Sequence, residues 1–279
     1  MNGAAGRWSE LAPAKINLAL HVRGRLPDGR HAIETLFAFC TDGDRVEGWF
    51  VPDGNGMSLE LAGPFASNLG EGTNLIERAW DAMRARVGVP GEGSCTAFRL
   101  TKTLPVASGV GGGSADAAAA LRLMTAMWGV DPSHAAAVAP SLGADVPACL
   151  LSMTARGEGA GDALRLIDDP SIPGTPILLV NPREPLSTRE VFARWEGADR
   201  GALGHDWRGG RNDLEAPARL LVPAIGEVLD WLAARDGVQI ARMSGSGATC
   251  FALLATDEQR DAAASACPER WWHLSTSLR

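Results

Sequence analysis

A run of glycines that opens onto an alanine-rich segment constrains this chain more than any other feature. From Gly109 to Gly113, four of the five residues are glycine. Without β-carbons, and with positive φ accessible, the backbone can approach a ligand and aim successive N–H groups at it. Ser114 and Asp116 suit the N-terminus of a helix that continues through Ala117 and ends before Gly129. The pattern predicts an anion site at a helix N-terminus, most often a phosphate site, although a flexible turn before an ordinary helix is the alternative.

The common phosphate-binding motifs do not account for this run. The chain contains no G-x-x-x-x-G-K-[ST] pattern, and a G-x-G-x-x-G pattern starting at Gly109 fails because Ser114 occupies the third glycine position. P-loop enzymes and Rossmann dinucleotide-binding units are therefore disfavoured.

The composition is compatible with a soluble enzyme and disfavours a structural metal or a zinc-centred mechanism. The 279 residues are enough for two domains, and 21% charged with 46% hydrophobic residues is ordinary for a globular protein. No segment has the length or apolarity of a membrane span or signal peptide. The five cysteines and five histidines have no metal-ligand spacing, and a net charge of −7 disfavours nucleic acid. We expect a cytoplasmic protein with reduced cysteines and no membrane or nucleic-acid partner.

Lysine is rare in this chain. Among 26 basic residues only Lys15 and Lys102 are lysine, and tyrosine is absent. Codon bias explains most of this. A tight phosphate site is a reason to retain the two lysines, because a compact ammonium cannot be replaced by the wide fork of arginine.

The first half of the chain reads as a mixture of strands and helices. Residues 14–22 alternate, which places Ile16 on one face of a strand with Lys15 and Asn17 on the other. A helix capped by Thr73 should end at Gly88. The remaining expected elements are a strand at 35–40, a strand at 95–101, the helix after the glycines, a helix from Ser133 to Gly143, and a strand at 148–153.

Glycine and proline clusters near residues 157–161 and 170–176 mark a domain boundary, giving domains 1–155 and 156–279. The second domain should contain a strand at 177–181, a helix near 189–195, a helical region from 216 to 235 interrupted at Pro223, strands at 238–243 and 249–254 around the turn 244–247, and a last helix and strand. Asn212 and Asp213 read as a helix N-cap. This order suits a small sheet covered by helices, of the ferredoxin-like type.

Three blocks of the chain resemble the galactokinase–homoserine kinase–mevalonate kinase–phosphomevalonate kinase (GHMP) superfamily. They are Ala12-Pro-Ala-Lys-Ile-Asn17, residues 105–118, and Met243-Ser-Gly-Ser-Gly-Ala-Thr249. The turn Pro27-Asp-Gly-Arg-His31 and Leu142-Gly-Ala-Asp-Val-Pro147 resemble the branch that phosphorylates a cytidine-diphosphate-linked methylerythritol. The resemblance implies an α+β, two-domain GHMP kinase fold, with an N-terminal domain like ribosomal protein S5 domain 2, a ferredoxin-like C-terminal domain, and the cleft between them.

The same resemblance implies an ATP- and Mg²⁺-dependent kinase of non-mevalonate isoprenoid synthesis, acting on a small molecule as a monomer or weak homodimer. Asp145 occupies the position of the family's base, and Lys15 that of its partner. Ser114 lies where relatives place the β- and γ-phosphates and Mg²⁺. The ATP-binding positions carried over are Pro105, Val106, Ala107, Ser108, Gly109, Val110, Gly111, Gly112, Gly113, Ser114 and Ala115, with Asn74 and Lys102 near adenine.

For the cytidine substrate, the matching positions are Asn17, Arg30, His31, Thr188 and Phe192. Arg30 stands where most relatives have a tyrosine that stacks on cytosine; it could stack with Phe192, contact the diphosphate, or be a solvated turn residue. Asp116 replaces a frequent asparagine, and could favour the helix dipole or attract Mg²⁺.

Two other functions stay open at this stage. One keeps the fold with another substrate, as in a homoserine or mevalonate-type kinase. The other is a catalytically silent member that binds nucleotide or sugar, which the joint presence of Lys15, Asp145 and Ser114 disfavours.

Overall fold

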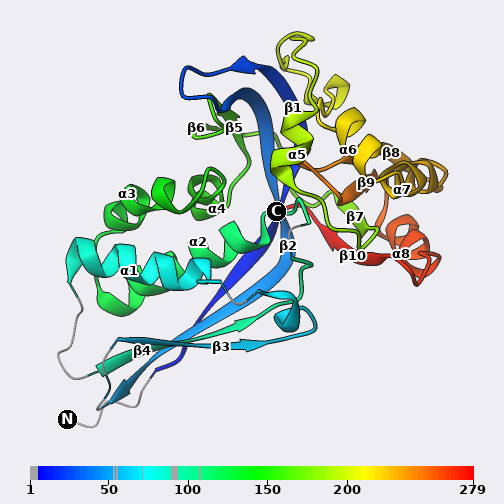
Figure 1. The fold of residues 1–279 in the computed structure, drawn as a ribbon. Helices are drawn as coiled ribbons and strands as arrows, with labels where there is room; N and C mark the ends of the chain where they lie inside the picture. Colours follow the sequence, from blue (N-terminus) through cyan, green and yellow to red (C-terminus); the bar gives the residue numbers. More distant parts are fainter. Residues whose placement is uncertain (1–5, 53, 55, 71, 89–93, 107) are drawn as a thin grey trace. The chain divides into compact units, whose positions relative to one another are not determined.

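The chain passes repeatedly between two units of mixed α and β structure (Figure 1). The computed structural model describes residues 6–52, 54, 56–70, 72–88, 94–106 and 108–279. Unit 1 consists of Met1–Ala14, Gly43–Val106 and Gly112–Leu151, and unit 2 of Lys15–Asp42, Ala107–Gly111 and Ser152–Arg279. The boundary expected between residues 155 and 156 falls inside the strand β5 (Ala155–Glu158), which belongs to unit 2.

Two long paired strands, β1 (Trp8–Arg25) and β2 (His31–Pro52), each contribute residues to both units. The strand predicted over residues 14–22 is confirmed. Every residue from 12 to 22 is buried, which the alternating pattern did not indicate. Both faces of β1 are covered, so Lys15, Asn17 and His21 are as inaccessible as the apolar residues between them.

In unit 1, four helices pack on one another beside a small sheet, as Figure 1 shows. The sheet pairs β4 with the second half of β2 in antiparallel fashion and with β3 in parallel fashion. The elements are β3 (Met57–Ala62), the 3-10 helix η1 (Ala66–Asn68), α1 (Leu75–Val87), β4 (Ser94–Thr101), α2 (Gly112–Trp128), α3 (Pro132–Leu142) and α4 (Val146–Leu151).

Three local predictions in unit 1 need correction. The cap of α1 is Asn74, whose side chain accepts from Ile76 N while Glu77 completes a capping box, so the cap is one residue after Thr73. The cap of α3 is Asp131, and Pro132 is the first helical residue. The strand predicted at 148–153 is instead the helix α4, because a short apolar run fits a buried helix as well as a strand.

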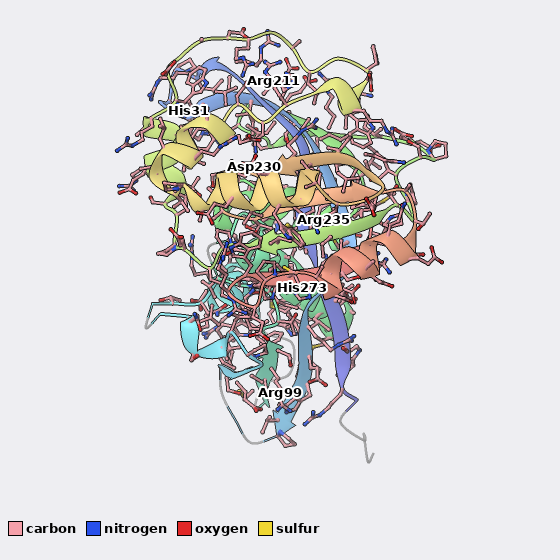
Figure 2. All side chains as sticks on the ribbon, turned by 90° about the vertical axis from the view of Figure 1, so that its right-hand side faces the viewer. His31, Arg99, Arg211, Asp230, Arg235 and His273 are labelled. Carbon is pink, nitrogen blue, oxygen red and sulfur yellow. The ribbon has the colours of Figure 1, made fainter. Side chains whose placement is uncertain are left out.

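In unit 2, a four-stranded antiparallel sheet has the order β10-β7-β9-β8, which is the arrangement of a βαββαβ ferredoxin-like unit and confirms that prediction. Figure 2 shows α7, on which Asp230 is labelled, lying over this sheet. The elements are β5 and β6 (Ala163–Leu166), β7 (Pro176–Asn181), α5 (Thr188–Ala193), the 3-10 helix η2 (Trp207–Gly209), α6 (Glu215–Leu221), α7 (Ala224–Ala233), β8 (Val238–Met243), β9 (Cys250–Leu254), α8 (Asp257–Ser265) and β10 (Trp272–Ser277).

The structure can be compared with two expectations from composition, which concern the cysteines and membrane-spanning helices. Among the described residues no disulfide joins the five cysteines, and three of them are buried. In the part of the chain that the structure describes, no helix combines the length and apolarity needed to cross a bilayer.

Candidate active site

The first part of the glycine run belongs to unit 2, in the segment 107–111. Residues 108 and 109 of this segment pack on the turn 244–247 and on Thr249, whereas Ala107 lies outside the described residues. The Thr249 amide donates to Ser108 O at 3.0 Å, and Ser244 Oγ donates to Gly109 O at 3.1 Å. At Gly109, where φ is +80°, a β-carbon would lie 2.6 Å from Gly247 O. Only glycine fits there, so the two glycine-rich segments are shaped for one another.

Lys15 lies directly against this loop. Its amide donates to Val110 O at 2.9 Å, and a β-carbon at Gly111 would lie 2.8 Å from Lys15 Cε. The side chain is only 3% exposed, and Nζ donates to Asn17 Oδ1 at 2.9 Å. The predicted catalytic lysine is therefore a buried residue fixed to the loop through its own backbone.

Asn17 joins Lys15 to the rest of unit 2. Its backbone amide donates to Ser244 Oγ at 3.1 Å, which in turn donates to Gly109 O. Its side-chain Nδ2 donates to Thr35 Oγ1 at 2.8 Å. The expected contact of Asn17 with substrate stays a prediction; what the geometry gives is a buried amide that orders both Lys15 and the glycine turn.

In unit 1, the start of α2 is anchored by a buried ion cluster of Asp44, Lys102 and Asp116. Lys102 Nζ donates to Asp116 Oδ2 at 2.7 Å and to Asp44 Oδ2. Asp44 Oδ1 accepts from the backbone amide of Leu104 at 2.8 Å. A β-carbon at Gly112, the first residue of α2, would lie 2.9 Å from Lys102 Nζ. This cluster ties β4, β2 and the glycine end of α2 together.

Burial raises the pKa of Asp116 to about 7, against the attraction of Lys102, and the neighbouring Asp44 adds to the rise. Burial acts to lower the pKa of Lys102, but Asp116 and Asp44 outweigh it and raise that pKa. From the sequence, Asp116 is expected to favour the helix dipole or to attract Mg²⁺, and neither explanation includes its contact with Lys102. Its described partner is the ammonium of Lys102.

The two positions expected near adenine both have local structural contacts. Asn74 Oδ1 accepts from Ile76 N at 2.9 Å, and Asn74 N donates to Glu77 Oε2 at 2.6 Å. Lys102 is 1% exposed, with its ammonium in the ion cluster. Adenine contact by either residue stays a prediction.

Asp145 lies in unit 1, half-buried, on the turn between α3 and α4. Its carbonyl accepts from Cys149 N at 3.0 Å, and Val146 N donates to Gly143 O at 3.1 Å. The carboxylate is thus carried immediately before a helix rather than before the predicted strand. This turn fixes the backbone of Asp145; its role as the base stays a prediction.

Ser114 lies half-buried in the first turn of α2, where its hydroxyl could hold Mg²⁺. The described residues contain no group of three or more His, Cys, Asp and Glu side chains able to bind a metal. A sparse donor set of this kind fits Mg²⁺, which keeps several waters and is held largely by substrate phosphates.

Three of the expected substrate residues lie together in unit 2. The His31 ring, labelled in Figure 2, is 4.6 Å from that of Phe192 between centroids, at an interplanar angle of 31°. Thr188 is the first residue of α5 and shares a 2.8 Å hydrogen bond with Ser246. Trp195, which the sequence did not single out, contacts His31 edge-on at 5.6 Å. Burial and the charge of Arg25 lower the pKa of His31, which favours the neutral imidazole.

The described contacts of the Arg30 guanidinium are with carboxylates. Its guanidinium donates to Asp28 Oδ2 at 2.8 Å and to Asp162 Oδ2 at 3.4 Å, and the side chain is 55% exposed. The ring that lies against Phe192 is that of His31. A role of Arg30 toward cytosine or diphosphate stays a prediction.

Sequence reasoning missed the residues that hold these groups in place. Asp44 is 58 residues from Lys102, and Thr35 is 18 residues from Asn17. The helix cap predicted at Asn212 and Asp213 is wrong, because the N-cap of α6 is Leu214 and has no side-chain cap. Asn212 instead accepts from Leu214 N, and its Nδ2 donates to Met243 O and Gly245 O. No local pattern signals such long-range partners.

The chain is similar to known kinases along its whole length. Residues 74–153 match the GHMP kinases N-terminal domain, and residues 199–272 match the GHMP kinases C-terminal model. A 4-diphosphocytidyl-2-C-methyl-D-erythritol kinase of Rhizorhabdus wittichii is 50% identical over 99% of both chains, and one of Hyphomonas neptunium is 42% identical over 100% of this chain and 99% of its own.

Among solved structures, a 4-(cytidine 5'-diphospho)-2C-methyl-D-erythritol kinase matches with a TM-score of 0.80 and 32% identity, over 97% of this chain and 99% of its own. A homoserine kinase of Cytophaga hutchinsonii matches with a TM-score of 0.71, over 100% of this chain and 96% of its own. It is only 14% identical, so that likeness concerns the fold alone.

Proposed function

We propose that this chain, which belongs to the GHMP kinase family, uses ATP to phosphorylate the 2-hydroxyl of 4-diphosphocytidyl-2-C-methyl-D-erythritol, in non-mevalonate isoprenoid precursor synthesis. For the substrate, the support is the full-length similarity to kinases of that name. For the chemistry, the observation that carries the proposal is the position of Lys15 at the glycine run. Its backbone amide donates to Val110 O, and its side chain packs against Gly111. We further infer a cytoplasmic enzyme that is a monomer or weak homodimer, without membrane or nucleic-acid partners.

In this proposal, the substrate hydroxyl oxygen attacks the γ-phosphorus, the bond from that phosphorus to the β–γ bridging oxygen breaks, and ADP leaves. Asp145 accepts the hydroxyl proton. Lys15 stabilises the negative charge that spreads over the transferred group, and the backbone N–H groups of the glycine run bind the phosphates. Mg²⁺, held by Ser114 and the phosphate oxygens, would supply further positive charge there.

The cytidine end of the substrate would occupy the surroundings of His31, Phe192 and Thr188. Aromatic rings offer stacking surfaces to a pyrimidine, and the neutral imidazole of His31 can form a hydrogen bond with its edge. His31 Nε2 is buried and has no hydrogen-bond partner among the described residues, which supports a ligand contact there. Trp195 extends the same aromatic group.

A coupled ADP-release assay with 4-diphosphocytidyl-2-C-methyl-D-erythritol tests this function, with homoserine and mevalonate as competing substrates. We expect turnover with the cytidine compound only. Asp145→Asn keeps the side-chain shape but removes the proton acceptor, so its kcat should fall roughly 10²–10⁴-fold with little change in substrate affinity. Preferred turnover of another alcohol would refute the substrate, and a near-normal kcat in Asp145→Asn would remove this base from the mechanism.

A further inference from the structure

Thr35 connects the buried strand β2 to the Lys15–Asn17 pair. It is 0% exposed, and its hydroxyl has two described partners, both from β1. Oγ1 donates to Ala19 O at 2.7 Å and lies 2.8 Å from Asn17 Nδ2. Neither the glycine run nor the proposed chemistry assigns Thr35 a role in the reaction.

The direction of each hydrogen bond in this group is fixed by elementary chemistry. A carbonyl oxygen only accepts, so the single hydroxyl proton of Thr35 must point to Ala19 O. Thr35 Oγ1 can then only accept from Asn17, which requires the amide nitrogen of Asn17 to face Thr35. The amide oxygen consequently faces Lys15 Nζ, at 2.9 Å. An amide flipped the other way would point N–H groups at an ammonium, which also only donates.

We propose that Thr35 is a positioning residue for phosphoryl transfer: it sets the amide orientation of Asn17, through which Lys15 is held at the glycine loop. This inference rests on the role of Lys15 in the proposed function. Asn17 alone can adopt two amide orientations of nearly the same shape. The hydroxyl of Thr35 makes only one of them compatible with the buried surroundings, so the ammonium meets an acceptor at a fixed place.

The substitution Thr35→Val removes the hydroxyl and keeps the branched shape, whereas Thr35→Ser keeps the hydroxyl. We expect kcat to fall about 10-fold in Thr35→Val, with KM for ATP within about two-fold of wild type, and Thr35→Ser to retain most of the turnover. The matched control is Thr276→Val in β10. Thr276 is a buried threonine of the same unit whose hydroxyl donates to Asp42 Oδ2 at 2.6 Å, and its loss should leave kcat unchanged.

A double-mutant cycle separates positioning from general weakening of the fold. If Thr35 acts through Lys15, Thr35→Val should have no further effect on single-turnover rates in a Lys15→Met background. An equal loss in both backgrounds, or a wild-type kcat in folded Thr35→Val, would overturn the inference. Should the valine variant fold too weakly, Thr35→Ala must show the loss and Thr35→Ser must not. If Lys15→Met itself turns over normally, the proposed role of Lys15 fails first, and the two failures are thereby distinguished.

Discussion

The two lysines of this chain occupy comparable places in the two units but have different surroundings. In unit 2, Lys15 lies against Gly111 and donates to the neutral amide of Asn17. In unit 1, Lys102 lies against Gly112 and donates to the carboxylates of Asp44 and Asp116. Both are at least 97% buried, and they abut successive residues of the glycine run.

The partners show what each cation does. Two carboxylates more than balance the charge of Lys102, so it acts as a structural tie at the start of α2. The amide oxygen of Asn17 holds the Lys15 ammonium beside the glycine loop, where we propose that it attracts phosphate oxygens. The retention of the two lysines thus has two separate reasons: Lys102 is a compact structural cation, and Lys15 is the proposed catalytic one.

The largest expected effect concerns Lys15 and turnover. Lys15→Met should lower kcat by roughly 10²–10⁴-fold, because charge stabilisation in the transition state is lost. The free energy of unfolding should fall by only about 1–3 kcal/mol, because the buried Asn17 Oδ1 loses its donor. Lys15→Arg should be impaired nearly as much, since the wide guanidinium does not fit the space beside Gly111. The measurement is ADP release combined with urea unfolding. An active arginine variant would show that charge alone suffices at this position.

Lys102 should give the opposite result. Lys102→Met leaves two buried carboxylates without their cation, which should lower the free energy of unfolding by about 3–5 kcal/mol. Urea denaturation measures this, with Lys15→Met as the matched buried lysine. The comparison fails if Lys102→Met is as stable as Lys15→Met and has lost turnover instead.

A smaller effect is expected for Asp116, on the pH dependence of the free energy of unfolding. The unfolded chain releases this proton near the usual aspartate pKa of about 3.9, whereas the folded protein holds it until about pH 7. Between these two pH values the folded state keeps the Asp116 proton and the unfolded state does not. The contribution of Asp116 to the free energy of unfolding therefore falls as the pH rises through this interval, and it levels off above pH 7. Between pH 5 and pH 8, the free energy of unfolding should decrease by about 1–3 kcal/mol less in Asp116→Asn than in the wild type. Urea unfolding at both pH values measures it; Asp81→Asn, an exposed carboxylate on α1, should keep the wild-type dependence.

The sequence was informative about the fold wherever one local signal was sufficient. Pro223 separates α6 from α7, and the turn 244–247 joins β8 to β9 as predicted. It failed at α4, where six apolar or small residues carry no period that distinguishes helix from strand. The burial of both faces of β1 could not be predicted, because it depends on the packing of distant segments.

For the site, motif blocks led to Lys15, the glycine run and the group of His31, Thr188 and Phe192. They did not lead to Asp44 or Thr35, whose partners lie far away in sequence and whose residue types are ordinary in strands. The role of Arg30 toward the substrate stays a prediction. The contact of its guanidinium with Asp28, two residues earlier in the chain, was not predicted.

The interleaving of the two units has a consequence for how the protein is made on the ribosome. All residues of unit 1 have been synthesised once Leu151 is added. The glycine loop, in contrast, is held by Ser244, which follows Gly109 by 135 residues. At about 5–20 residues per second, the loop would wait roughly 7–27 seconds for this partner. We therefore expect the proposed phosphate-binding segment to be among the last parts of the nascent chain to reach its final conformation.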